Sequence, residues 1–204
     1  MYYTIHPPYI LRLLYRKVTW KSHGEKVIYL TFDDGPHPTL TNHIIKLLDQ
    51  YKAKATFFCI GENVMKYPEV YASILNNGHK TGNHTHRHLN GWKTLKRKYL
   101  EDIRKASSII DSKLFRPPYG RITPAQLRAV KRKGMQPVMW SVLSGDFDRK
   151  LSPQKCAQNV ILNAGPGSVI VFHDSDKAAD RMLYALPKVL EHFSKLGYVF
   201  KGLE

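Results

Sequence analysis

The stretch Val27–Pro36, VIYLTFDDGP, places an apolar run directly before two adjacent carboxylates and a Gly-Pro pair. The β-branched and aromatic residues of Val27–Thr31 favour a buried strand, and the Gly-Pro pair marks the loop that follows it. A dinucleotide-binding fold would have a glycine-rich phosphate loop after this strand, and none follows here. Asp33 and Asp34 are therefore expected at the carboxyl end of a first strand.

Outward from this stretch, β-like runs alternate with helix-like segments. The expected strands are Val27–Thr31, Ala55–Cys59, His79–Gly82, Leu114–Phe115, Met135–Trp140, Ser168–Phe172 and Tyr198–Phe200. Between them, apolar residues recur at helical spacing, as in Leu40–Tyr51 and Leu186–Phe193. This alternation indicates an α/β fold with a parallel sheet and helical crossovers. A distorted parallel (β/α) barrel of about seven strands is favoured, with an open doubly wound sheet as the alternative.

Length and composition are those of one globular domain. The chain has 204 residues, 43% of them hydrophobic and 24% charged, which suits a full core without disulfides or a structural metal. We expect residues 1–25 to form an N-terminal extension packed on or beside a main domain of residues 26–204, in a monomer. Cys59 and Cys156 are expected as buried free thiols, with a disulfide as the weaker alternative.

The net charge of +16 is large for 23.5 kDa. It indicates an acidic partner, which is nucleic acid, an anionic membrane surface or an anionic glycan. The densest basic runs, Lys93–Lys98 and Arg128–Lys133, lie in helix-like segments, where such runs usually form a solvated face. They show no interleaved aromatic pattern of the kind that single-strand binders use, so nucleic acid is disfavoured.

Tyr9–Tyr15, YILRLLY, is the most apolar early stretch. It is too short for a signal or transmembrane segment and contains Arg12. Since Arg16 and Lys17 follow it, a helix on a membrane surface is one interpretation. A terminal helix packed on the domain is the simpler one, which we favour. No conventional signal peptide is recognised, so the compartment stays open between the cytoplasm and export by another route.

Polar residues follow five of the expected strands. They are Asp33 and Asp34; His84, His86 and His88; Arg116; Asp146 and Asp148; and His173 and Asp174. Because polar residues at the carboxyl ends of barrel strands converge on one rim, we expect these side chains to meet there.

The spacing of His84 and His88 puts both imidazoles on one face of a helical turn and leaves His86 pointing elsewhere. Two histidines and a carboxylate give three protein ligands for Zn²⁺ or a similar ion, with a position left for water. Of Asp33 and Asp34, one carboxylate can bind the metal while the other accepts a proton. Alone, each motif also fits an ordinary polar loop or turn, but together they indicate a metal site that activates water.

His173 follows a strongly apolar strand, where a lone histidine is more often a core residue than a catalytic one. Its position at a strand's C-terminal end favours an acid or base. The adjacent Asp174 is a candidate to orient it. The sequence leaves both interpretations open.

Four separate motifs, in family order, make the chain resemble the polysaccharide deacetylases, carbohydrate esterase family 4, with the nodulation-type chitooligosaccharide deacetylase domain. They are TFDDGP at Thr31–Pro36, HTxxH at His84–His88, RPPYG at Arg116–Gly120, and the strand-end His173. The resemblance runs from about Lys26 to Lys201, so residues 26–204 would be the catalytic domain. It implies a distorted (β/α) barrel and an acetylated polysaccharide or oligosaccharide as substrate.

By this resemblance, Asp34, His84 and His88 hold one divalent metal ion, usually Zn²⁺, with Co²⁺ or Mn²⁺ as alternatives. Asp33 is the implied catalytic base and His173 the implied general acid. Asp33 would take a proton from the attacking water, and His173 would give one to the leaving amine.

The resemblance further implies that Arg116 positions Asp33 and that Asp146 pairs with Arg116. The backbone N–H of Tyr119 would help to stabilise the oxyanion.

Pro118, Tyr119, Phe147 and Val171 are the implied substrate-binding residues. Two of them depart from the family pattern. Leu143–Phe147 reads LSGDF where the family has DxxDW, and Val171 replaces the leucine of LxH. Phe147 and Val171 would therefore wall the acetyl pocket, which leaves the acyl preference open.

N-deacetylation of N-acetylglucosamine- or N-acetylmuramic-type residues, a hydrolysis of linear amides, is the leading prediction. O-acetyl ester hydrolysis on a polysaccharide such as xylan is the alternative within the family. A non-catalytic glycan-binding domain would be expected to lose Asp33, a metal ligand or His173, and nucleic-acid binding rests on charge alone. Anionic peptidoglycan suits the +16 charge, whereas neutral chitooligosaccharides leave it unexplained.

Overall fold

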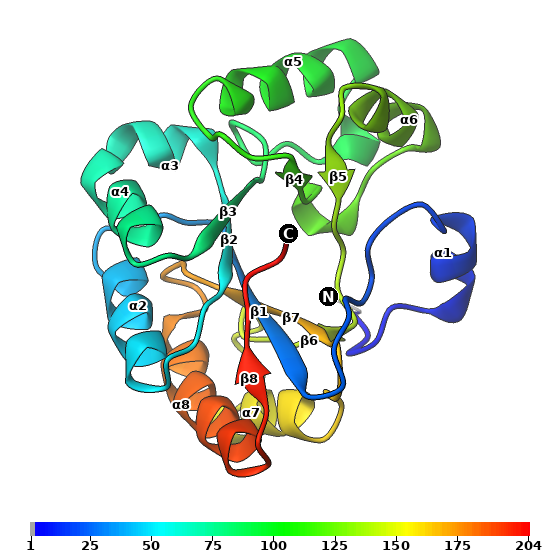
Figure 1. The fold of residues 1–204 in the computed structure, drawn as a ribbon. Coiled ribbons are helices and arrows are strands. Elements are labelled where there is room, and N and C mark those ends of the chain that lie inside the picture. Colours follow the sequence, from blue (N-terminus) through cyan, green and yellow to red (C-terminus); the bar gives the residue numbers. More distant parts are fainter. Residues whose placement is uncertain (1–2) are drawn as a thin grey trace.

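The computed structural model describes residues 3–204. Its strands are β1 (Val27–Asp33), β2 (Thr56–Cys59), β3 (Lys80–Asn83), β4 (Leu114–Phe115), β5 (Gln136–Pro137), β6 (Val142–Leu143), β7 (Val169–His173) and β8 (Val199–Phe200). Seven follow one another in the order β5-β4-β3-β2-β1-β7-β6, all parallel, and β8 pairs with the start of β1. The sheet curls into a half-barrel surrounded by helices (Figure 1). The prediction of a distorted (β/α) barrel is confirmed.

The helices are α1 (Tyr9–Leu14), α2 (Leu40–Gln50), α3 (Gly61–Lys66), α4 (Pro68–Asn76), α5 (Lys96–Ser107), α6 (Pro124–Arg132), α7 (Pro153–Ile161) and α8 (Ala179–Lys195), with short 3-10 turns η1 (Gly91–Lys93) and η2 (Pro118–Gly120). Helices alternate with most of the strands, although α1 precedes β1, α3 and α4 both follow β2, and β6 follows β5 directly. Thr123 and Ser152 cap α6 and α7 with side-chain hydrogen bonds. The apolar faces of α2 and α8 pack on the central strands and form the main core.

The expected strand Met135–Trp140 is wrong in extent. The chain pairs with β4 as β5, and then crosses the opening of the half-barrel to pair with β7 as β6. The run Met135–Leu143 is mostly apolar and is interrupted by Gln136, Pro137 and Ser141. One segment thus supplies the strands at both edges of the curled sheet. Its first part pairs with β4 and its last part with β7, which is possible because the sheet curls and brings its two edges near each other.

The N-terminal segment is fastened across the same opening. Leu143 N donates to Ile5 O at 2.9 Å, and Thr19 N donates to Pro137 O at 3.0 Å. Lys21 forms an isolated bridge with Ser168. Residues on this segment therefore contact both edges of the sheet, while the division of the chain at residue 25 stays a prediction.

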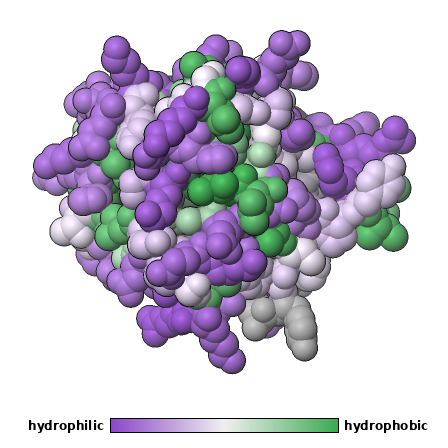
Figure 2. Space-filling view, turned by 90° about the horizontal axis from the view of Figure 1, so that it is seen from below, coloured by the Kyte–Doolittle hydropathy of each residue, from purple (hydrophilic) through white to green (hydrophobic). Residues whose placement is uncertain are grey.

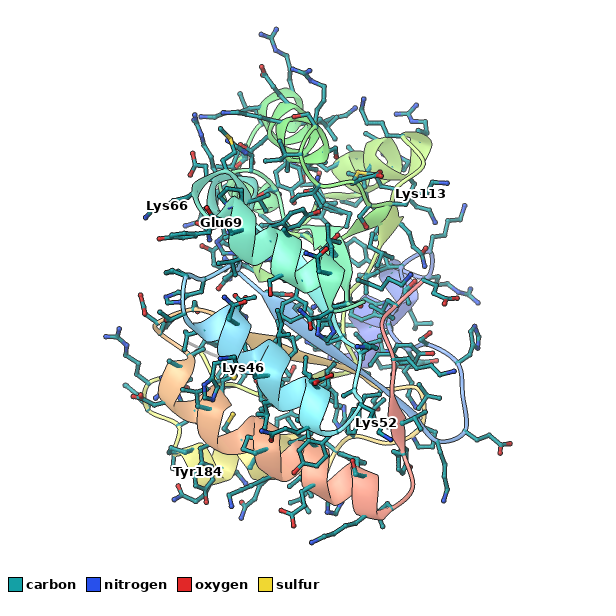
Figure 3. All side chains as sticks on the ribbon, turned by 60° about the vertical axis from the view of Figure 1, so that its left-hand side comes forward. Lys46, Lys52, Lys66, Glu69, Lys113 and Tyr184 are labelled. Carbon is teal, nitrogen blue, oxygen red and sulfur yellow. The ribbon has the colours of Figure 1, made fainter. Side chains whose placement is uncertain are left out.

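The helix expected near Tyr9–Tyr15 forms as α1, but it buries none of its residues. Leu11 is half-buried and the other apolar residues of the helix are exposed, and its packing on the domain stays a prediction. Cys59 and Cys156 are free and buried, as predicted. Within residues 3–204, every helix is too short or too polar to cross a membrane. Figure 3 shows lysines such as Lys46 and Lys113 on different parts of the outer surface, so the positive charge is spread widely.

Candidate active site

Residues that follow different strands meet at one end of the half-barrel. β1 lies between β2 and β7, and its last residue, Asp33, is in register with His173, the last residue of β7. These two residues line a cleft of about 250 Å³ together with Asp34, His84 and His88. The structure therefore brings together the residues that the sequence assigned to base, acid and metal ligands.

Asp34, His84 and His88 form a cluster whose donor atoms all lie within 4.8 Å of one another. Asp34 Oδ1 is 3.1 Å from His88 Nε2 and 3.7 Å from His84 Nε2. His84 Nδ1 donates to Arg116 O at 2.8 Å, which leaves Nε2 free to bind a cation. Burial lowers the pKa of His84 to about 4, so the neutral, metal-binding imidazole is present at pH 7. This donor set fits Zn²⁺ or a similar ion.

His84 and His88 do not share a helical turn, and that part of the expectation is wrong. They belong to a loop in which Thr85 and His88 have φ of 65° and 54°, and this backbone brings the two rings to 5.0 Å between centroids. Asp102 of α5 fastens the loop by accepting from His86 N and Arg87 N at 2.8 and 3.0 Å. The buried Asp102 is a positioning residue that the sequence gave no reason to select.

Arg116 follows β4 and is completely buried. Its Nη1 donates to Asp33 Oδ1 and Thr31 Oγ1, both at 2.7 Å, and its Nη2 donates to Met139 O at 2.8 Å. The guanidinium also lies 4.0 Å from the centroid of the Phe58 ring. Arg116 can thus hold Asp33 as an oriented anion, which is the arrangement that the resemblance implied for this pair.

Asp146 pairs with His173 and not with Arg116, so the expected Arg116–Asp146 pair is wrong. Its two carboxylate oxygens accept from His173 N and His173 Nδ1, each at 2.7 Å. Burial lowers the pKa of His173, but the charge and hydrogen bond of Asp146, with the charges of Asp34 and Asp33, outweigh it and raise that pKa to about 10. Asp174, the other candidate to orient His173, accepts instead from Thr41 Oγ1 at 2.5 Å. The hydrogen bond and charge of Asp146 therefore favour the protonated form of His173.

Three of the four predicted substrate-binding residues line the cleft. They are Tyr119, Phe147 and Val171, whereas Pro118 is buried in η2 and is not part of the lining. Phe147 meets His173 edge-on, with 5.3 Å between ring centroids. Tyr119 lies against His88 with 4.6 Å between ring centroids.

Other residues that line the cleft were not predicted. Tyr3 reaches it from the N-terminal segment and packs on Phe147 with 5.0 Å between ring centroids. Trp140, Arg121 and Lys177 also line it. Arg121 follows the RPPYG motif directly, and its position next to that motif could have been used to predict it. The contact made by Tyr3 depends on the tertiary fold alone.

A family model described as polysaccharide deacetylase matches residues 21–138. A peptidoglycan-N-acetylglucosamine deacetylase of Bacillus cereus is 37% identical over 190 residues, covering 90% of this chain and 89% of that protein. A chitooligosaccharide deacetylase of Azorhizobium caulinodans is 33% identical over 168 residues, covering 78% of this chain and 80% of that protein.

A solved structure has the same fold over nearly the whole chain. It is a peptidoglycan N-acetylglucosamine deacetylase in complex with 4-naphthalen-1-yl-N-oxidanyl-benzamide, with a TM-score of 0.88 and 33% identity. The match covers 97% of this chain and 95% of that one. With the family model, the two relatives and this fold in agreement, the chain belongs to the polysaccharide deacetylase family.

Proposed function

We propose that this protein is a metal-dependent hydrolase that removes N-acetyl groups from amino-sugar residues of a peptidoglycan- or chitin-type glycan. Family membership and the activities named for its relatives support this proposal. So does the placement of Asp33 and His173 on neighbouring strands beside the cluster of Asp34, His84 and His88.

Asp34, His84 and His88 would hold the metal ion. When bound, a divalent ion such as Zn²⁺, with Co²⁺ or Mn²⁺ as alternatives, lowers the pKa of water and polarises the acetyl carbonyl. Asp33 is left free for proton transfer, because Arg116 engages only its Oδ1. Its Oδ2 lies 3.9 Å from His84 Nε2 and can take the proton of the attacking water.

The substrate carbonyl and nitrogen need two further groups. We assign the backbone N–H of Tyr119, in η2, to the developing oxyanion. His173 donates its Nε2 proton to the amide nitrogen as the C–N bond breaks, so that nitrogen leaves as a neutral amine. Asp146 binds Nδ1 of the same ring and thereby fixes which nitrogen faces the cleft.

The His173–Asp146 pair is the observation that favours an amide over an ester. An amine is a poor leaving group and needs a proton, whereas an alkoxide or aryl oxide needs less help. A buried carboxylate that raises the pKa of His173 favours a ready proton donor, which an amide hydrolase requires and an esterase can do without.

The test is acetate release from N-acetylated chitooligosaccharides, peptidoglycan fragments and acetylated xylan, after chelation and after reloading with Zn²⁺, Co²⁺ or Mn²⁺. We expect metal-dependent release from an N-acetylated substrate. The His173→Ala variant should lose more kcat/KM on that substrate than on an aryl acetate. Release from acetylated xylan alone would assign the O-acetyl esterase activity instead, and equal losses on both substrates would contradict the acid role of His173.

Two cations at the cleft support an anionic glycan as the finer substrate class. Arg121 and Lys177 line the cleft, and the Arg121 guanidinium lies 5.2 Å from the ring centroid of the exposed Trp92. An arginine beside an exposed aromatic face can bind a carboxylate on a sugar ring next to the cleft. Arg121→Gln should raise KM several-fold for an acidic oligosaccharide but not for a neutral one of equal length. Arg128→Gln, on the exposed face of α6, is the matched control.

A further inference from the structure

The helix α1 presents an apolar face that the rest of the described structure leaves uncovered. Tyr9, Ile10, Leu13 and Leu14 are 74%, 65%, 46% and 71% exposed. At about 100° per residue, these four side chains fall within an arc of roughly 140° on the helix surface. Figure 1 shows α1 standing out at the right of the barrel, and Figure 2 shows hydrophobic atoms on the same projection. A contiguous exposed patch of this kind marks an interaction surface.

The charged residues next to this face in the sequence are all positive. Arg12 lies on α1, Arg16 and Lys17 follow it, and residues 1–24 contain neither Asp nor Glu. Within residues 3–204, none of these three cations forms an ion pair. An apolar helix face bordered by arginine and lysine is typical of helices that lie in the interface of an anionic bilayer.

The segment that contains α1 is fastened beside the cleft at both ends. Before the helix, Tyr3 lines the cleft, and His6 Nδ1 donates to Ser141 O at 2.8 Å. After it, Tyr15 Oη donates to Ile122 O at 2.9 Å, next to the cleft residue Arg121. The helix is therefore held near the rim, and a surface that accepts its apolar face lies close to the cleft.

We propose that α1 is an interfacial helix that docks this protein on an anionic lipid bilayer and holds the cleft at the membrane surface. Anionic headgroups would neutralise Arg12, Arg16 and Lys17. A second copy of this chain fits less well, because it would bring like charges together. A single short helix gives peripheral, reversible binding. The docking itself does not depend on the proposed deacetylase activity.

The test is co-sedimentation of the full chain with vesicles of phosphatidylglycerol and phosphatidylcholine, and with vesicles of phosphatidylcholine alone. We expect at least roughly tenfold stronger partitioning to the anionic vesicles, with binding that weakens as salt is added. Leu14→Glu should lower this partitioning roughly tenfold or more. The change removes apolar area that would be buried in the bilayer and adds a negative charge that the anionic lipids repel. Leu196→Glu is the matched control, since Leu196 is an exposed leucine after α8, and it should bind like the parent.

Thermal unfolding should be unchanged in Leu14→Glu, which shows that a loss of binding is not a loss of folding. Arg16→Gln combined with Lys17→Gln leaves the apolar face intact and should weaken binding to anionic vesicles selectively. Equal binding to both vesicle types, or undiminished binding of Leu14→Glu, would overturn the proposal. So would a dimer in lipid-free sedimentation velocity that Leu14→Glu converts to a monomer, because a second copy would then cover the face.

Discussion

Two buried aspartates beside the cleft differ in what binds their oxygens. Asp33 gives Oδ1 to Arg116 and keeps Oδ2 directed to the candidate metal cluster, 3.9 Å from His84 Nε2. Asp146 gives both of its oxygens to His173. Arg116 thus orients Asp33 and leaves its other carboxylate oxygen free to take a proton. Asp146 has no free oxygen, and its charge serves instead to favour the protonated form of His173. The two residues are of the same type, and their hydrogen-bond partners give them different roles. Asp33 is placed to act as a base, and Asp146 to support the acid His173.

The largest effect should come from removing the cluster that both proton carriers serve. His84→Ala deletes a ligand whose Nε2 faces Asp34, and it should lose most of the bound metal and nearly all activity. Metal content by elemental analysis and acetate release are the measurements. His86→Ala is the matched control from the same loop and should keep its metal. Stoichiometric metal in His84→Ala would contradict the assignment of this ligand.

Asp33→Asn tests whether Asp33 acts as the base. This nearly isosteric change leaves Asp34, His84 and His88 in place, so metal binding should persist. Removing the base should reduce kcat/KM roughly 10²-fold or more. A variant with full metal and full activity would show that Asp33 does not accept the proton.

The Asp146 side is tested by pH. His173 must be protonated to act as an acid, so activity should fall as pH rises through its pKa, which Asp146 raises above the ordinary 6.5. In Asp146→Asn the charge is gone, and the alkaline fall of kcat/KM should move to lower pH, with roughly tenfold lower activity at high pH. A bound dication also lowers the pKa of His173, so the variant is compared with the parent under identical metal loading. An unmoved alkaline limb would leave Asp146 with a purely structural role.

Much of the fold follows from local sequence. The strand–helix alternation and the buried thiols were predicted from local patterns, and the structure bears them out. The split of Met135–Leu143 into β5 and β6 is not a local property. A mostly apolar run has the same sequence pattern whether it pairs with one edge of the sheet or with both. The surroundings of α1 are not a local property either, since apolar periodicity does not say whether the partner surface belongs to the same chain.

The candidate site shows the same division. The motifs give the residues that meet in the cleft, because strand ends converge in this fold. They do not give the partners across strands, and the Asp146–His173 pair was therefore misassigned to Arg116. Backbone strain is equally hidden. Of the five non-glycine residues with positive φ in 3–204, four are Asp34, Thr85, His88 and Tyr119, at or beside the cluster, and such conformations persist where surrounding contacts enforce them.

The smallest effect should come from changing Phe147, the cleft residue that packs on the proposed acid His173. Phe147 packs edge-on against both His173 and Tyr3, so Phe147→Trp enlarges the ring between them. Metal binding should be unaffected, since Phe147 is not one of the candidate ligands Asp34, His84 and His88. A larger ring leaves less room for the acyl group, and the ratio of acetyl to propionyl hydrolysis should rise several-fold, by roughly tenfold at most. The measurement is kcat/KM on matched N-acetyl and N-propionyl oligosaccharides. Because Tyr3 packs on the same ring, Tyr3→Ala should relax the acyl selectivity in the opposite direction, and an unchanged ratio in both variants would show that this wall does not contact the acyl group.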